Sequence, residues 1–351
     1  MQDFDQKAMM RCFQLAQLGS RNTKTNPMVG AVIAYHQKIL GEGFHKQFGE
    51  AHAEINALNN VREQDKHLIG ESTLYVSLEP CSHYGKTPPC AESIVNAGIR
   101  KVVIGIEDPS SKVAGKGIAF LKKHGVEVEF SKLRLQAEHL IRPFTVHLHG
   151  RPYIILKWAQ SYDHFTGKEH EQIWISNKYS KFISHYWRSE SDGILIGKNT
   201  ALTDNPSLTT RLVAGENPTR IVLDRKLEVP DTSTIFDGKV KTIIFNSVKE
   251  DIKDAIVWKK IPADAQELPF ILKSLFDTGI YYLIVEGGTT VLKSFIKAGF
   301  WDEARYISSK SLLHEGIPAP TITGHLSKKY LLETDEIKYV LNLNPKYELF
   351  G

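Results

Sequence analysis

The chain of 351 residues is 42% hydrophobic and 24% charged, which is the composition of an ordinary globular protein with material for two or three domains. Its net charge of +4 suits a phosphorylated small molecule as well as nucleic acid. The chain has no lysine- and arginine-rich tail, no apolar run of membrane-spanning length, and no apolar stretch after residues 1–5 that would mark a signal peptide. We therefore expect a cytoplasmic protein without a membrane or nucleic-acid partner.

The first part of the chain alternates strand and helix patterns. Hydrophobic periodicity predicts helices over residues 4–18, 51–61, 89–97, 118–124 and 133–144, and strands over 29–35, 39–43, 72–78, 101–106 and 126–130. This alternation predicts an α/β fold with a largely parallel or mixed sheet. The sequence His149-Gly150-Arg151-Pro152 interrupts the pattern, so we expect two domains, residues 1–147 and 148–351.

The second part restarts the alternation. Strands are expected over residues 153–159, 193–197, 220–224, 242–246, 281–286, 304–308 and 337–343, and helices over 177–188, 268–278 and 289–298. The second domain is therefore also predicted to be α/β.

One imidazole and two thiols of the first part stand in a pattern typical of a catalytic zinc site. His52, Cys81 and Cys90 are good zinc ligands, and three protein ligands leave the fourth tetrahedral position open for water. Glu54 follows the histidine by two residues and is placed to move protons without binding the metal. The pattern H-x-E followed by P-C-x-x-C belongs to zinc deaminases, but here eight residues separate the cysteines instead of two.

Other interpretations of these side chains stay open at this point. A lone histidine or cysteine is more often a core residue than a ligand, and Cys12, in an amphipathic helix pattern, is expected to be a buried thiol. A disulfide between Cys81 and Cys90 would need an oxidising compartment. A structural zinc would need a fourth protein ligand, which His83 could supply.

The second part carries three weaker signals for a phosphate-bearing ligand. The turn Glu286-Gly287-Gly288-Thr289 lies between a strand and a helix, where backbone amides can approach a phosphate, although a plain tight turn explains it equally well. The polar loop over residues 204–211 ends in Arg211, whose guanidinium can fork onto phosphate. Lys157, within a strand, reads alone as a snorkelling lysine. The usual dinucleotide motif G-x-G-x-x-G is absent from the sequence.

Taken together, the motifs resemble the family of bifunctional riboflavin-biosynthesis deaminase/reductases over nearly the whole chain. In the first part these are His52-Ala53-Glu54, Glu79-Pro80-Cys81-Ser82-His83, the run over residues 85–90, Asp108-Pro109 and the run over residues 113–117. In the second part they are the runs over residues 156–159, 174–176, 194–197, 204–209, 220–224 and 286–288. The nine-residue step from Cys81 to Cys90 is that family's pattern.

For the first domain, the resemblance implies a cytidine-deaminase-like fold and hydrolysis of the 2-amino group of a 2,5-diamino-6-ribosylaminopyrimidinone 5′-phosphate. Zinc would be held by His52, Cys81 and Cys90, and Glu54 would carry protons from water to the ring nitrogen and the leaving amine. Asn26 would hydrogen-bond the pyrimidine. The candidates for the ribose phosphate and its surroundings are His45, Lys86 and Asp108, and Lys86 is favoured because it is positively charged.

For the second domain, the resemblance implies a dihydrofolate-reductase-like fold that uses NADPH to reduce the ribosyl group to a ribityl chain. The substrate side would be lined by Lys157, Gln172, Arg188, Leu208, Arg211 and Glu286. The cofactor would be contacted by Gln160, Trp174, Thr200, Asp204, Arg225, Gly288, Thr289, Thr290, Val291, Leu292, Lys293 and Ser294. Arg225 is assigned to the 2′-phosphate by its charge.

Two departures from the family pattern fall in the reductase half. The family usually reads Ser-Leu-Asp-Gly-Lys after the Lys157 strand, whereas this chain reads Ser161-Tyr162-Asp163-His164-Phe165. Replacing the glycine with His164 suggests a changed turn, because glycine often supplies a positive φ. Gln172 stands where a small serine is common.

Three alternatives remain. A nucleic-acid editing enzyme, such as a tRNA adenosine deaminase with an unrelated C-terminal domain, would share the zinc chemistry but should carry a basic, aromatic-lined groove. A non-catalytic, zinc-stabilised ligand sensor would have no use for Glu54. A chain with one surviving activity would more readily have lost the reductase. A homo-oligomer is expected from the resemblance alone.

Overall fold

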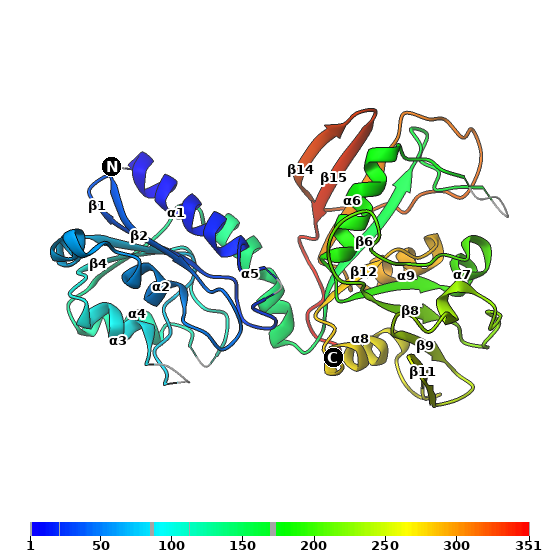
Figure 1. The fold of residues 1–351 in the computed structure, drawn as a ribbon, viewed down its shortest axis with the longest axis horizontal. Helices are drawn as coiled ribbons and strands as arrows, with labels where there is room; N and C mark the ends of the chain where they lie inside the picture. The colour runs from blue at the N-terminus through cyan, green and yellow to red at the C-terminus, as the bar shows by residue number, and fades with distance from the viewer. Residues whose placement is uncertain (1, 21, 85–87, 112, 169–172, 351) are drawn as a thin grey trace. The chain divides into compact units, whose positions relative to one another are not determined.

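The computed structural model describes residues 2–20, 22–84, 88–111, 113–168 and 173–350, and the chain divides into two compact units, Met1–Leu148 and His149–Gly351 (Figure 1). Each unit has its own sheet and its own hydrophobic core. Of the described helices, none is long and apolar enough to cross a membrane.

The first unit is built on a five-stranded mixed sheet of order β2-β1-β3-β4-β5. Strand β1 pairs antiparallel with β2 and β3, whereas β3, β4 and β5 run parallel. The strands are β1 (Gly30–Tyr35), β2 (Lys38–Phe44), β3 (Thr73–Val76), β4 (Lys101–Ile104) and β5 (Glu127–Phe130). The helices are α1 (Gln2–Gln17), α2 (Ala53–Asn59), the 3-10 helix η1 (Glu63–Glu71), α3 (Cys90–Asn96), α4 (Lys116–Lys123) and α5 (Arg134–Leu148). The mixed sheet expected from the sequence is confirmed.

Helices cover both faces of this sheet because its strands are apolar on both sides (Figure 1). Val32, Tyr75 and Val103 pack with residues of α1 and α5. Their neighbours along the strands, such as Ile33 and Leu74, point to the other face and pack with residues of α2, α3 and α4. The result is a three-layer α/β/α unit.

The second unit is built on a ten-stranded sheet of order β10-β11-β9-β8-β7-β12-β6-β13-β15-β14. The strands from β11 to β13 in this order run parallel, and antiparallel pairs flank them at both ends. The strands are β6 (Tyr153–Gln160), β7 (Gly193–Gly197), β8 (Thr219–Leu223), β9 (Thr242–Asn246), β10 (Asp251–Lys253), β11 (Ile256–Lys260), β12 (Tyr282–Val285), β13 (Glu303–Ser308), β14 (His325–Leu332) and β15 (Asp335–Leu341). The helices are α6 (Lys178–Ser189), α7 (Lys198–Asp204), η2 (Thr234–Phe236), α8 (Glu267–Asp277) and α9 (Thr289–Ala298).

Helices α8 and α9 pack on one face of the second sheet, where Leu272 and Phe295 join the main core (Figure 1). Helix α6 contacts the other face, where Trp187 donates a hydrogen bond from its indole Nε1 to the hydroxyl of Tyr339 on β15 (3.0 Å). Because β6, β7 and β12 are parallel neighbours, their carboxyl ends meet at one edge of the sheet.

Several elements were not predicted. Strand β14 was missed because most of its side chains are exposed, so it shows no alternation of apolar and polar residues. Strands β10 and β11 form a short hairpin at the opposite end of the sheet, and α7 spans a single polar segment of seven residues.

Candidate functional site

Three elements of the first unit bring the predicted zinc ligands together. His52 is the residue immediately before α2, and Cys90 is the first residue of α3. Cys81 lies in the loop after β3, where its carbonyl accepts a hydrogen bond from the Ala91 backbone N–H (3.1 Å). Helix α2 can lie close against β2 because residue 43 is a glycine. A Cβ at this position would come within 2.3 Å of a backbone nitrogen in that helix.

The distances between these side chains fit a tetrahedral zinc ion. His52 Nδ1 lies 3.2 Å from Cys90 Sγ and 3.6 Å from Cys81 Sγ, and the three ligand atoms lie within 4.8 Å of one another. Zinc–sulfur bonds of about 2.3 Å and zinc–nitrogen bonds of about 2.0 Å place such atoms about 3.5 Å apart. His83 is exposed and is not part of this group, so the described residues offer three ligands and leave one position open.

The thiols are free and one of them is strongly acidified. Cys12, Cys81 and Cys90 form no disulfide, and Cys12 is buried as expected. Hydrogen bonds from Cys90 and His52 lower the pKa of Cys81 to about 4, so its sulfur is a thiolate at neutral pH. A thiolate in this position is the form that binds zinc.

Glu54 lies in the first turn of α2, directly behind the ligand group. Its side chain is buried, and burial raises the pKa of its carboxyl, with the charge on His52 opposing that shift. A carboxyl group with a raised pKa holds a proton more readily than an ordinary carboxyl, as a general acid–base catalyst requires. The structure therefore places an acid–base group beside the three ligands.

Asn26 and His45 extend the site along one side of His52. His45 Nδ1 donates to the carbonyl of Ala51 (3.3 Å), which leaves Nε2 to accept from Asn26 Nδ2 (3.3 Å). The rings of His45 and His52 lie edge to face with centroids 5.4 Å apart. Burial lowers the pKa of His45, so the imidazole is neutral at pH 7.

Asp108 lies on the other side of the cysteine loop. It is buried, burial raises the pKa of its carboxyl to about 6, and its Oδ1 accepts the Ser110 backbone N–H (2.7 Å). Lys86, the favoured phosphate ligand, lies outside the described residues, as does Gln172 of the second unit.

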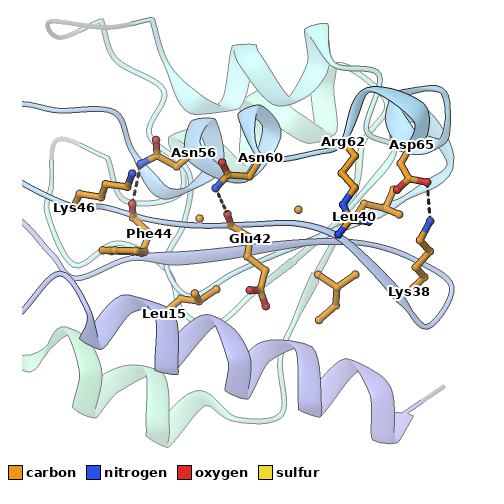
Figure 2. Close-up of a pocket in the computed structure, with 13 residues that line it drawn as sticks. Leu15, Lys38, Leu40, Glu42, Phe44, Lys46, Asn56, Asn60, Arg62 and Asp65 are labelled. Carbon is orange, nitrogen blue, oxygen red and sulfur yellow. Dashed lines mark hydrogen bonds and ion pairs between the residues drawn. The ribbon is translucent and has the colours of Figure 1, made fainter.

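A pocket of about 530 Å³ in the first unit is separate from these residues (Figure 2). It lies along the outer edge of β2, and no candidate site residue lines it. Figure 2 shows the side chains of Asn56 and Asn60 directed at this strand, where they donate hydrogen bonds to the carbonyls of Phe44 (2.8 Å) and Glu42 (2.7 Å). These amides cover backbone groups that an edge strand would otherwise expose.

Three of the candidate residues in the second unit form a charged group. Arg188 of α6 holds Glu286 in a two-pronged ion pair, with Nε 2.9 Å from Oε1 and Nη2 2.7 Å from Oε2. Lys157 of β6 places its Nζ 3.5 Å from the same Oε2. Burial alone would raise the pKa of Glu286, but the charges of Arg188 and Lys157 hold it at about 2. Burial lowers the pKa of Lys157.

The two glycine-containing turns at the carboxyl ends of β7 and β12 lie side by side. A Cβ on Gly287 would come within 3.3 Å of the Gly197 backbone nitrogen, so glycine permits the close approach. The Gly288 N–H donates to the Thr200 hydroxyl (2.8 Å), which joins the start of α9 to α7. These turns bring Thr200 to the predicted helix start at residue 288, whereas Asp204 lies at the opposite end of α7.

Residues of α9 differ in what they can offer a ligand. Leu292 is buried in the core, and its backbone N–H donates to the Gly288 carbonyl (3.2 Å). Thr289 shares a hydrogen bond with Thr166 (3.3 Å between hydroxyl oxygens), which ties the helix start to the turn after β6.

The loop after α7 carries Leu208 and Arg211. Leu208 is buried and adopts a left-handed backbone conformation, with φ of 52°. The Arg211 backbone N–H donates to His185 Nδ1 (3.2 Å), and its guanidinium donates to the Ser207 hydroxyl (2.7 Å). His185 was not predicted, although it stands three residues before Arg188 on the same face of α6.

Trp174 and Arg225 each have a charged partner of their own. Trp174 is exposed, with the ammonium of Lys181 3.6 Å above its ring. Arg225 forms an ion pair with Glu267 in the first turn of α8, with Nε 3.0 Å from Oε1, so its guanidinium already has an anionic partner.

Gln160 is buried and links two side chains near the end of β6. Its Oε1 accepts from Trp158 Nε1 (2.8 Å), and its Nε2 donates to His164 Nδ1 (2.8 Å). His164 itself takes a left-handed conformation, φ 63°, of the kind that glycine supplies.

Both units match known families. Residues 2–106 match the cytidine and deoxycytidylate deaminase zinc-binding region, and residues 152–338 match the RibD C-terminal domain. The alternative of a tRNA deaminase with an unrelated C-terminal domain finds no support, because the C-terminal unit matches the RibD C-terminal domain.

Relatives are similar over the whole chain. The riboflavin biosynthesis protein RibD of Bacillus amyloliquefaciens is 41% identical over 90% of this chain and 87% of its own length, and that of Aquifex aeolicus is 37% identical over 90% and 89%. The solved structure of a diaminohydroxyphosphoribosylaminopyrimidine deaminase/5-amino-6-(5-phosphoribosylamino)uracil reductase from Thermotoga maritima is 30% identical, with a TM-score of 0.83 over 97% of this chain and 99% of that one.

These similarities confirm the α/β fold class expected for both halves, a cytidine-deaminase-like unit followed by a RibD reductase unit. The similarities extend through both units. The first unit holds the cluster of His52, Cys81 and Cys90, and the second holds the charged group of Lys157, Arg188 and Glu286. The chain therefore belongs to the RibD family of bifunctional deaminase/reductases of riboflavin biosynthesis.

Proposed function

We propose that the first unit removes the 2-amino group of 2,5-diamino-6-ribosylamino-4(3H)-pyrimidinone 5′-phosphate by zinc-assisted hydrolysis, and that the second unit reduces the product's ribosyl group with NADPH. The observation that carries the first half is the convergence of one imidazole and two thiols beside the buried carboxyl of Glu54. When bound, zinc supplies a Lewis acid that lowers the pKa of water to about 7. The second half is supported by the charged group around Glu286.

In the deaminase unit, this chain's residues would bind the pyrimidine and move its protons. Asn26 would hydrogen-bond the ring, since the bond between its Nδ2 and His45 Nε2 fixes the orientation of the amide, and His45 would lie near the ribose phosphate. Glu54 would take a proton from water, deliver it to the ring nitrogen and then protonate the leaving amine. The balanced reaction replaces the C–NH₂ group by a carbonyl and releases ammonia. Lys86 would bind the ribose phosphate through its charge.

In the reductase unit, the protein would position the substrate and polarise it. NADPH, when bound, supplies the hydride that C1′ of the opened ribosyl imine receives. Lys157, Arg188 and Glu286 would hold the substrate, together with Gln172, Leu208 and Arg211. The start of α9, Thr200, Asp204, Gln160 and Trp174 would contact the cofactor. Arg225 would reach the 2′-phosphate by exchanging its Glu267 partner.

The test follows two signals on one protein sample with the diaminopyrimidine ribotide. Ammonia release is measured without NADPH, and NADPH oxidation is measured after NADPH is added. We expect ammonia first and NADPH oxidation only after deamination. Ammonia without NADPH oxidation would overturn the second half of the proposal, and silence in both signals with zinc bound would overturn the first.

Two further expectations belong to the proposal and rest on family membership. We expect a homo-oligomer, which light scattering of the purified protein tests. We also expect the protein to work in the cytoplasm, where NADPH and sugar phosphates are available, and fractionation of the source cells tests this location.

A further inference from the structure

Glu79, two residues before Cys81, carries a buried carboxylate that binds backbone groups of a distant segment. Its side chain is 3% exposed. Oε2 accepts hydrogen bonds from the backbone N–H groups of Asp108 (3.2 Å) and Gly115 (3.0 Å), and Oε1 accepts from that of Ile118 (3.1 Å). Three N–H donors satisfy a buried carboxylate without a cation.

The partners of this carboxylate are Asp108 in the loop after β4, and Gly115 and Ile118 at the start of α4. Gly115 is the residue before α4 and adopts a left-handed conformation, with φ of 72°. A Cβ on Gly117 would come within 1.9 Å of the Pro80 carbonyl oxygen, so only glycine lets the helix start contact the cysteine loop. The Glu79 backbone N–H also donates to the Ile106 carbonyl (2.9 Å), which anchors the residue from the other side.

Glu79 therefore stands between two parts of one site. On one side is the loop that carries Cys81, and on the other is Asp108, whose backbone N–H donates to the Glu79 carboxylate. A change in the reach of the Glu79 side chain moves Asp108 and the start of α4 relative to the cysteine loop, because the same carboxylate holds both.

We propose that Glu79 is a positioning residue of the deaminase site, which sets the distance between the Cys81 loop and the wall formed by Asp108 and the start of α4. This inference rests on the proposed deamination and on Asp108 as a candidate contact of the ribose phosphate. The Glu79 carboxylate accepts from backbone N–H groups and acts through the segments that carry them, so its loss should weaken substrate binding more than it slows the chemical step.

The experiment compares Glu79→Gln with Glu107→Gln in the full chain. Glutamine keeps the size of the side chain but has one acceptor oxygen, so at least one of the three N–H groups loses its partner. Glu107 is exposed and adjacent to Asp108, so the control makes the same charge change in the same segment. The measurements are KM and kcat for ammonia release, zinc content, and hydrogen exchange at the Gly115 and Ile118 amides.

We expect KM to rise about tenfold for Glu79→Gln, the effect of losing roughly one buried hydrogen bond, while kcat changes less and zinc stays at one per chain. Exchange at the Gly115 or Ile118 amide should quicken by a similar factor. Glu107→Gln should match the wild type. A KM equal to that of the control, or a fall in kcat with loss of zinc and no change in KM, would overturn the proposal.

A second variant tests whether the length of the Glu79 side chain matters or only its negative charge. Glu79→Asp keeps the negative charge but is one methylene shorter, so it should raise KM as the glutamine variant does. A KM at the wild-type value would show that charge alone matters, and the positioning role would be wrong. If the wild type and Glu107→Gln both release no ammonia, the proposed function fails, while the exchange data still decide whether Glu79 holds the segment.

Discussion

The Nζ of Lys157 lies 3.5 Å from Oε2 of Glu286, although 129 positions separate the two residues in the chain. The register of two parallel strands explains why they meet. Val285, the last residue of β12, pairs with Leu156 of β6, and Glu286 and Lys157 are the residues that follow this pair. Arg188 completes the group from α6. A cation with a lowered pKa and a fixed carboxylate thus stand at the carboxyl end of the sheet, where ligands of such folds bind.

Replacing the lysine tests whether this group serves reduction. Lys157→Met keeps the length of the side chain and removes its charge, so it should slow NADPH oxidation by about 10²-fold, as is typical for loss of one positioned charged donor. Ammonia release should stay at the wild-type rate, because Lys157 belongs to the second unit. Lys273→Met, which removes an exposed ammonium of α8, is the matched control. Equal loss of both activities would contradict the separation of the two sites.

Glu54 should be required for deamination but not for metal binding. Glu54→Gln removes the proton carrier and preserves the shape of the buried side chain, so ammonia release should fall by about 10³-fold. Zinc content, measured by metal analysis, should remain at one per chain, because the ligands are His52, Cys81 and Cys90. Glu50→Gln, an exposed carboxylate near the start of α2, is the control. Retained ammonia release would remove Glu54 from the mechanism.

Removal of zinc should separate the two activities. A chelator strong enough to strip zinc should abolish ammonia release and leave NADPH oxidation with the deaminated substrate unchanged, since the three ligands lie in the first unit. Cys90→Ser should have the same effect without a chelator. Added zinc should restore the chelated wild type but not the variant. Ammonia release that survives in Cys90→Ser at the wild-type rate would show that this thiol is not a ligand.

The zinc ligands could be found from the sequence because their chemistry is local. His52 and Glu54 share one helix turn, and Cys81 and Cys90 flank a short loop, so spacing alone brings them close. The helix expected over residues 89–97 is α3, which begins one residue later than expected, at Cys90, with Pro89 as its N-cap. Their burial and mutual distances, in contrast, depend on how α2 and α3 pack against the sheet, which spacing does not determine.

The second site could not be assembled from spacing. Lys157, Arg188 and Glu286 come together because β12 lies between β6 and β7. No local sequence pattern predicts this order of strands. The prediction that these three residues share one site came from the resemblance to a known family. Glu79 and His185 were missed as contact residues because their partners are backbone N–H groups, which carry no side-chain signal in the sequence.

The free energy of unfolding should decrease as the pH falls below 6.5, because His185 is harder to protonate in the folded protein than in the unfolded chain. Burial, together with the charges of Arg188 and Arg211, lowers the pKa of His185 from 6.5 to about 4. Between these values the unfolded chain binds a proton that the folded protein does not, so the free energy of unfolding decreases as pH falls from 6.5 to 4. Urea unfolding at pH 7 and pH 5 should show a smaller difference for His185→Gln than for the wild type. An imidazole resonance of His185 that titrates near 6.5 would contradict this prediction.

His164 should tolerate glycine and reject a β-branched residue. Its φ of 63° lies in the left-handed region, where a β-branched side chain is strained, so His164→Val should destabilise the second unit by about 1–2 kcal/mol. His164→Gly relieves the backbone but loses the hydrogen bond with Gln160 (2.8 Å), and these effects should offset each other to within about 1 kcal/mol. Tyr162→Val, at an exposed side chain of the same turn, is the matched control. Thermal unfolding of the three variants measures the difference, and a valine variant as stable as the glycine variant would show that the backbone at this turn is not constrained.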